Sequence, residues 1–250
     1  MKKVDSSRYA QFVNYLIIFL LINAPAYPSV IEDTVSNHII KILKDKKGNQ
    51  FLVSDLRGKK IYSKYFSNPS IYFYDLDGDA ADETVIVDSI PNSTSFNYSI
   101  YVYSFEPEFE FCDSMVIGRN LPEFYDFDSD LGYFIKIYDS RFENVFGSTL
   151  RILPIQFYTL VDKVLIPDNE FSFEEYESEL DNLLILLDEV KRGFSCSDLE
   201  AKKDIQKIIS VIYADLIYMD SKLSLENFIK QNYPCSDIES LLEILKQFFE

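Results

Sequence analysis

The sequence predicts an α+β protein, with a β-rich N-terminal half of antiparallel, propeller-blade-like meanders and an all-α C-terminal region of helical hairpins. Three observations predict this class. Apolar and aromatic residues alternate with period two from about residue 37 to 167, which is typical of strands. The spacing changes to three and four residues near Glu170, which is typical of helices. The β half also matches itself at a fixed offset.

The β half is expected to be antiparallel. Segments such as 99–105 and 134–138 alternate Ile, Val, Tyr and Phe with other residues. Short turn-forming groups of Gly, Pro and Asn separate these segments, at 47–49, 57–58, 68–69, 91–93 and 106–108. We therefore assign residues 27–168 to an antiparallel β domain.

The C-terminal region, residues 169–250, is expected to form a helical domain of two antiparallel helix pairs. The first helix follows the N-cap residue Ser172 and ends at Lys191-Arg192-Gly193. A second spans about 198–219, and two shorter helices span about 225–231 and 237–248. Their apolar stripes are explained by core packing.

An internal repeat divides the β domain. Residues 73–79 match residues 124–130, and Asp88-Ser89 matches Asp139-Ser140, at an offset of 51. Two copies, at about 69–120 and 121–167, have the length of a four-stranded blade, and residues 35–66 leave room for a partial third. A closed propeller needs at least about four blades, so a compact twisted sheet or small sandwich is expected.

The first copy contains a comb of acidic residues suited to calcium. Asp75, Asp77 and Asp79 alternate along a loop that curls at Gly78, and Glu83 follows the loop. These four carboxylates and the backbone carbonyl of Ala81 supply about six hard oxygen ligands, the number and type that Ca²⁺ takes. The alternative is that the acids point outward from a solvated turn. An EF-hand is excluded because its closing Glu belongs at position 12, where Ile86 stands.

This loop resembles the calcium loop of FG-GAP/VCBS-type repeats, the integrin-like β units with the pattern Asp-x-Asp-Gly-Asp-Gly-x-Asp-Glu. The resemblance covers residues 69–90 closely and 122–140 weakly, and does not extend to the helices. It implies the same ligand set, Asp75, Asp77, Asp79, Ala81 and Glu83, with Ala80 where the family has Gly.

The second copy of the loop is expected to be degenerate. It keeps Asp126, Asp128 and Asp130, but Phe134 stands where the closing acid belongs. We expect this loop to bind a metal weakly or not at all.

The N-terminus predicts export. Residues 1–26 combine a basic start, an apolar stretch at 13–22 and the small-x-small motif Ala24-Pro25-Ala26, as in a cleaved signal peptide. A membrane anchor is the alternative, but this stretch is shorter than the ~20 residues that span a bilayer. The mature protein is thus expected to be periplasmic or secreted, from a bacterial source, without stable membrane insertion.

Charge and cysteine content narrow the class further. A net charge of −17 argues against nucleic-acid binding. Cys196 and Cys235 lie in similar settings before predicted helices, so they are expected to form a disulfide that leaves Cys112 in the β core. Three reduced core thiols are an equally open alternative.

Two functions follow. The first is an exported, non-catalytic calcium-binding protein that contacts a protein or glycan partner. The sequence gives no catalytic motif to set against it: the single histidine, His38, has no such motif around it, and the seven glycines form no phosphate loop. The second is an extracytoplasmic carboxylate-dependent hydrolase, similar to a glycosidase. A cleft with two acids not used by calcium would favour the second, and a flat aromatic face the first.

Overall fold

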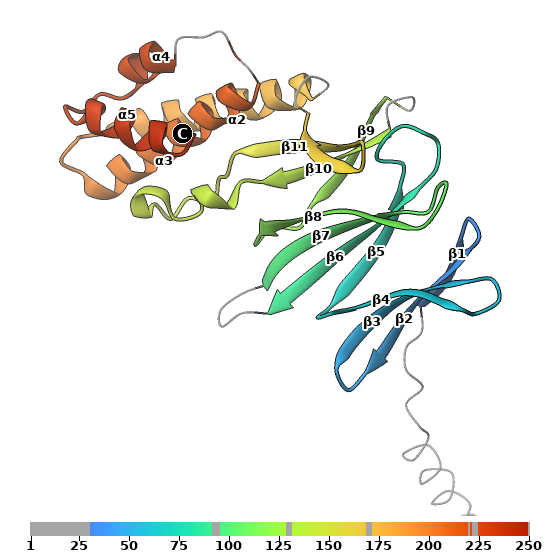
Figure 1. The fold of residues 1–250 in the computed structure, drawn as a ribbon. Helices are drawn as coiled ribbons and strands as arrows, with labels where there is room; N and C mark the ends of the chain where they lie inside the picture. The colour runs from blue at the N-terminus through green and yellow to red at the C-terminus, as the bar shows by residue number, and fades with distance from the viewer. Residues whose placement is uncertain are drawn as a thin grey trace, which may run out of the picture. The chain divides into compact units, whose positions relative to one another are not determined.

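The chain has an α+β fold, confirming the predicted class. The computed structural model describes residues 31–91, 96–128, 132–168, 172–219, 221 and 225–249, and the predicted signal peptide lies outside them. Within these residues three four-stranded antiparallel sheets precede four α-helices (Figure 1). They divide into two compact units, one up to Tyr65 and the other from Phe66 onward.

The first unit is one complete antiparallel sheet, called sheet A. Its strands are β1 (Ile31–Val35), β2 (His38–Asp45), β3 (Gly48–Asp55) and β4 (Lys60–Phe66), in that order. Ile40, Ile42, Phe51 and Val53 are buried in it. The sequence predicted only a partial copy here. The repeat was identified by its comb of aspartates, and this segment has strands of full length without that comb.

The second unit begins with two further meanders. Sheet B contains β5 (Pro69–Tyr74), β6 (Glu83–Pro91), β7 (Phe96–Ser104) and β8 (Glu110–Gly118). Sheet C contains β9 (Glu123–Asp128), β10 (Gly132–Tyr138), β11 (Ile155–Val161) and β12 (Val164–Pro167). Their ranges fall within the two predicted repeat copies. The sheets share one apolar core that includes Val85, Val87, Ile100, Val102, Ile135, Ile137, Leu160 and Leu165.

The matched residue Asp88 has a clear role in sheet B. Pro69 and Asp88 are paired across β5 and β6. The carboxylate of Asp88 is buried and accepts hydrogen bonds from the backbone N–H groups of Ser67, at 3.1 Å, and Asn68, at 2.7 Å. It therefore provides acceptors for the backbone N–H groups of the turn that leads into β5.

The helices follow the predicted spans closely. Two short 3-10 helices, η1 (Ser140–Phe142) and η2 (Val145–Gly147), lie between β10 and β11. The α-helices are α2 (Phe173–Lys191), α3 (Leu199–Tyr218), α4 (Leu225–Asn232) and α5 (Ile238–Gln247). None of the helices in the described part is long and apolar enough to cross a membrane. Their facing sides form an apolar core that includes Leu183, Leu187, Ile208, Ile212 and Leu242.

The cap of α2 differs from the expectation. Ser172 is the N-cap residue, but its hydroxyl makes no capping hydrogen bond and is buried without a partner among the described residues. Its carbonyl accepts the N–H of Tyr176 at 3.1 Å. In α3, by contrast, the carboxylate of Asp198 accepts the N–H of Ala201 and caps the helix.

The cysteines lie as the sequence suggested. Cys196 and Cys235 are disulfide-bonded and precede α3 and α5, so the bond ties the starts of these two helices together. Cys112 is a free, half-buried thiol in β8. Burial raises its pKa to about 11, so this thiol stays protonated at neutral pH.

The helices lie beside sheet C (Figure 1), and hydrogen bonds attach them to it. The hydroxyl of Tyr176 donates to the carbonyl of Ile155 at 3.1 Å, and the N–H of Ile155 donates to Asp215 Oδ1 at 3.2 Å. The hydroxyl of Tyr218 donates to Asp139 Oδ2 at 2.5 Å. The helical region, which we predicted as a separate domain from residue 169, thus lies in the same compact unit as sheets B and C.

Asp215 is the most deeply buried acid of this contact, with an exposed fraction of 0%. Its Oδ2 has no hydrogen-bond partner among the described residues. Burial raises the pKa of Asp215 well above its ordinary range, and the single hydrogen bond from Ile155 only partly opposes this.

We predict that Asp215→Asn changes the pH dependence of stability. The native carboxyl holds a proton that the unfolded chain releases above its ordinary pKa of 3.8. The stability of the native protein therefore falls as pH rises from this value toward the raised native pKa. Asparagine does not titrate, so the free energy of unfolding of the variant should rise relative to that of the wild type by up to about 1.4 kcal/mol for each unit of increasing pH. Urea unfolding at pH 5, 6 and 7 measures the difference. A difference that is the same at all three pH values would show that Asp215 is ionised in the native protein.

Candidate metal centre

The loop between β5 and β6 is curled by its own aspartates. Asp75 Oδ1 accepts the N–H of Gly78 at 2.8 Å, and Oδ2 accepts the N–H of Ala80 at 2.9 Å. Gly78 and Ala80 have positive φ angles of 75° and 69°. Ala80 thus adopts, with an alanine, the conformation that glycine favours. The loop therefore closes even though its sequence departs from the family pattern at this position.

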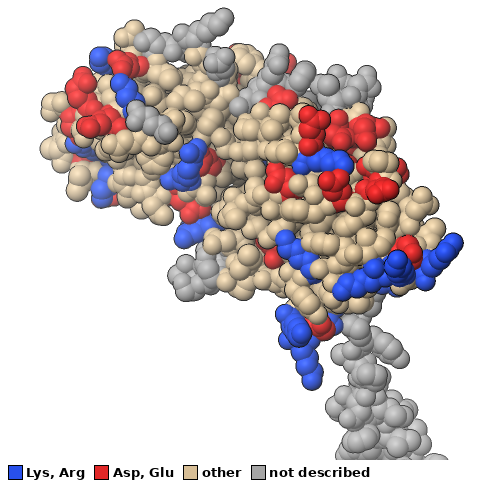
Figure 2. All heavy atoms as spheres, in the orientation of Figure 1, with Lys and Arg blue, Asp and Glu red and all other residues tan. Residues whose placement is uncertain are grey.

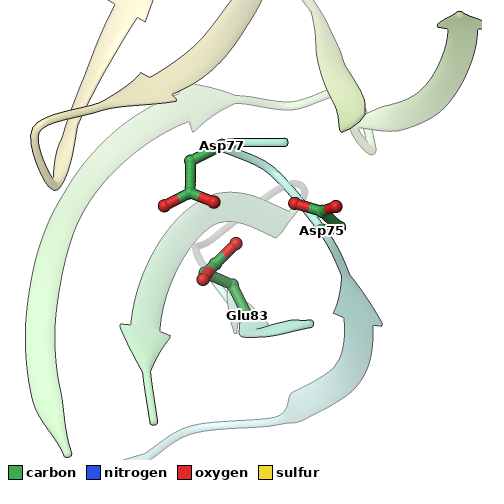
Figure 3. Close-up of side chains that lie close together, drawn as sticks. All are labelled: Asp75, Asp77 and Glu83. Carbon is green, nitrogen blue, oxygen red and sulfur yellow. The ribbon is translucent and has the colours of Figure 1, made fainter. Parts of the chain in front are cut away.

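Three carboxylates meet inside this loop. Oxygen atoms of Asp75, Asp77 and Glu83 lie within 4.8 Å of one another, and Figure 3 shows the three side chains around one space. Asp77 and Asp75 come from the loop, whereas Glu83 is the first residue of β6. None of the three forms an ion pair with Lys or Arg in the described part of the chain.

The other two expected ligands are placed differently. Asp79 is not part of the group of three. Its Oδ1 accepts the N–H of Ala81 at 2.8 Å, while its own N–H donates to Asp77 Oδ1 at 3.2 Å. Ala81 is half-buried. The structure thus brings together three of the four expected carboxylates, while the fourth, that of Asp79, forms a hydrogen bond within the loop.

Glu83 is the buried member of the group, with an exposed fraction of 1%. Its Oε2 accepts the N–H of Leu76 at 2.9 Å. Burial, together with the nearby charges of Asp77, Asp79 and Asp75, raises the pKa of Glu83 to about 8, although the bond from Leu76 opposes the rise. Burial and the charge of Asp79 also raise the pKa of Asp77. A cation among these oxygens would remove this mutual repulsion.

The spacing of the oxygens suits calcium. Ca²⁺ lies about 2.3–2.6 Å from each oxygen ligand, so two ligands on opposite sides of one ion are about 5 Å apart. Oxygens of the three side chains within 4.8 Å of one another satisfy this limit. Carboxylates are also the hard ligands that Ca²⁺ prefers.

The same loop joins sheets B and C through its backbone. The carbonyl of Asp75 accepts the N–H of Tyr133 at 2.5 Å. The carbonyl of Leu76 accepts both the hydroxyl of Thr159, at 3.0 Å, and the N–H of Leu160, at 3.1 Å. The side chain of Leu76 is fully buried in the core shared by the two sheets. The carboxylates and the contact between the sheets therefore belong to one short segment.

The second Asp loop has no comparable acid cluster within the described residues. Asp126 is exposed in β9, and Asp128 ends the same strand. Asp130 lies outside the described residues. Phe134, at the position equivalent to Glu83, is buried and packs with Phe157 and Tyr176. An apolar ring therefore occupies the place of the closing acid.

Comparisons of the chain with protein-family models, with curated proteins and with solved structures each find no significant match. The resemblance to FG-GAP/VCBS repeats therefore stays a prediction that depends on the loop residues themselves.

Sequence reasoning did not identify Gly132 as part of this site. Gly132 opens β10 with a φ angle of +79°, and a Cβ atom there would lie 2.6 Å from the carbonyl oxygen of Asp75 and 3.0 Å from the nitrogen of Gly78. The one available signal was a glycine directly after the second Asp comb, in a chain with only 7 glycines. A close approach between backbones explains why a side chain is excluded here.

We predict that Gly132→Ala destabilises the second unit more than Gly193→Ala does. Gly193 has the matching φ angle of +78° and nothing within 4 Å of a Cβ atom, so its substitution reports only the backbone strain, about 1–2 kcal/mol. Gly132→Ala adds the clash with the acidic loop. Urea unfolding of both variants measures the difference, and equal losses would show that the loop yields to the new methyl group.

Proposed function

We propose that this chain is an exported, non-catalytic binding protein whose acidic loop holds one Ca²⁺ ion. The observation that carries the proposal is the meeting of Asp75, Asp77 and the buried Glu83 in a loop that also joins two sheets. These three side chains would hold the ion. Neutralising them would stabilise the loop and, through the carbonyls of Asp75 and Leu76, the contact with sheet C.

The surface supports attraction of cations. The chain carries a net charge of −17, and Figure 2 shows several groups of acidic side chains, with Lys and Arg side chains beside them, on the face in view. Clustered negative charge raises the local concentration of cations and disfavours nucleic acid. The function proposed here therefore involves no nucleic-acid partner.

An aromatic cluster beside the loop supports a partner-binding role. The ring centroids of Tyr74 and Phe124 are 4.3 Å apart, and those of Tyr74 and Tyr133 are 4.7 Å apart. Tyr72 stacks next to Tyr74, and all four side chains are half-buried. Aromatic rings that are partly exposed are suited to contact a protein or a glycan. In this proposal, the ion fixes the loop that directly follows Tyr74 of this cluster.

We predict that Ca²⁺ raises the melting temperature of the chelator-treated mature protein more than Mg²⁺ does. An ion that binds only the folded state at a hundred times its Kd adds about 2.7 kcal/mol. Asp77→Asn should abolish the rise. Asp82→Asn, which removes the same charge from an exposed position in the same loop, should retain it. Differential scanning fluorimetry measures both, and a missing response to millimolar Ca²⁺ in the wild type would refute the metal site.

One cavity favours the alternative, a carboxylate-dependent hydrolase. A cavity of about 470 Å³ is lined by Glu123 and Glu179, neither of which belongs to the metal centre. However, both oxygens of Glu123 already accept hydrogen bonds from tyrosine hydroxyls, Tyr138 at 2.8 Å and Tyr125 at 2.9 Å. An acid engaged in this way is poorly placed to attack a sugar or a water molecule, so we prefer the binding protein.

We therefore expect no hydrolysis of aryl glycosides by the purified protein. A chromogenic assay with α- and β-linked substrates tests this expectation. Turnover that Glu179→Gln abolishes, while Glu177→Gln on the exposed side of the same helix leaves it intact, would establish the hydrolase instead.

A further inference from the structure

A second cavity, remote in sequence from the acidic loop, has the chemistry of a small-molecule site. It measures about 440 Å³ and lies among the link between β8 and β9, the residues between η1 and η2, and the segment before β11. Arg119, Asn120, Glu143, Thr149 and Arg151 are among its lining residues. This volume is in the range of small-molecule pockets.

Two arginines face this cavity in a chain of net charge −17. The exposed Arg151 forms no hydrogen bond or ion pair with any residue that the structure describes. Arg119 contacts Glu143 through Nε alone, at 3.3 Å from Oε2. The terminal nitrogens of both guanidinium groups therefore remain available in the described structure for an anion such as a carboxylate.

Glu143 offers the opposite chemistry in the same cavity. Its Oε1 is buried and lacks a hydrogen-bond donor among the described residues. The buried amine of Lys207 donates to the carbonyl of Phe142. The Glu143 side chain is 18% exposed and makes an ion pair with Arg119 at 3.3 Å, so its negative charge would attract an ammonium group that enters the cavity.

An adjoining cavity extends the site. It shares Asn120, Arg151 and Leu153 with the first cavity. Its remaining lining includes aliphatic side chains, Leu121 and Ile152, and the two acids Glu123 and Glu179. An aliphatic chain that ends in a positive charge matches this lining, because the stem contacts the apolar residues and Glu179 attracts the cation. Glu123 already lies 3.9 Å from the amine of Lys136.

We propose that these two cavities bind a free α-amino acid with a basic side chain. Arg151 and the terminal nitrogens of Arg119 bind its carboxylate, and the negative charge of Glu143 attracts its ammonium group. The side chain extends into the adjoining cavity toward Glu179. This site involves none of the residues of the acidic loop.

The test is isothermal titration calorimetry of the mature protein with L-lysine, L-leucine, L-glutamate and L-lysine amide as probes, with and without Ca²⁺. We expect L-lysine to bind with one-to-one stoichiometry and more tightly than L-leucine, and L-glutamate to bind weakest. Lysine amide, which lacks the carboxylate, should bind about tenfold or more weaker than L-lysine.

Variants locate the binding. Arg151→Ala should weaken L-lysine binding about tenfold to a hundredfold, whereas Arg57→Ala, the same change in the turn between β3 and β4, should have no effect. Glu143→Gln should weaken binding of lysine and leucine alike, while Glu179→Gln should remove only the preference for lysine. Circular dichroism verifies that each variant is folded.

The proposal is overturned if millimolar L-lysine gives no binding heat, if lysine amide binds as tightly as L-lysine, or if Arg151→Ala leaves the affinity unchanged. Failure of the calcium experiment would not affect this result, because the two sites share no residue.

Discussion

The second unit depends on two consecutive backbone carbonyls, those of Asp75 and Leu76. They accept three hydrogen bonds from β10 and β11 of the neighbouring sheet. The side chain of Leu76 fills the core between the same sheets. Because these carbonyls lie in the segment that carries the carboxylates, the electrostatics of the acidic loop act directly on the contact between sheets B and C.

Sheet C connects this loop to the helices. At one end of β11, Thr159 and Leu160 donate to Leu76. At the other end, the N–H and carbonyl of Ile155 bond to Asp215 and Tyr176. A single strand therefore couples the acidic loop to α2 and α3 through hydrogen bonds in the protein interior, where their geometry is strict. The helices are therefore an integral part of this compact unit, bonded to sheet C through β11.

The sequence predicted those features that depend on local patterns. Helix spans follow from apolar spacing, and the curl of the acidic loop follows from the alternation of Asp75, Asp77 and Asp79. It missed features that arise where distant segments meet. The turning of Asp79 toward Ala81 depends on the detailed loop geometry, and the approach of Gly132 to Asp75 requires both sheets. The cavity between Arg119, Glu143 and Arg151 combines three segments, none of which has a motif of its own.

The bond from Thr159 to Leu76 has a consequence for the order in which the chain folds. The two residues are 83 positions apart. During synthesis, sheet B can form its four strands before any of β11 has emerged, since its own pairings are local. The carbonyls of the acidic loop then lack their donors in β10 and β11 until these strands are made and a long loop closes. A chain truncated before β10 would therefore carry its aspartates on a turn held by the loop's own hydrogen bonds alone.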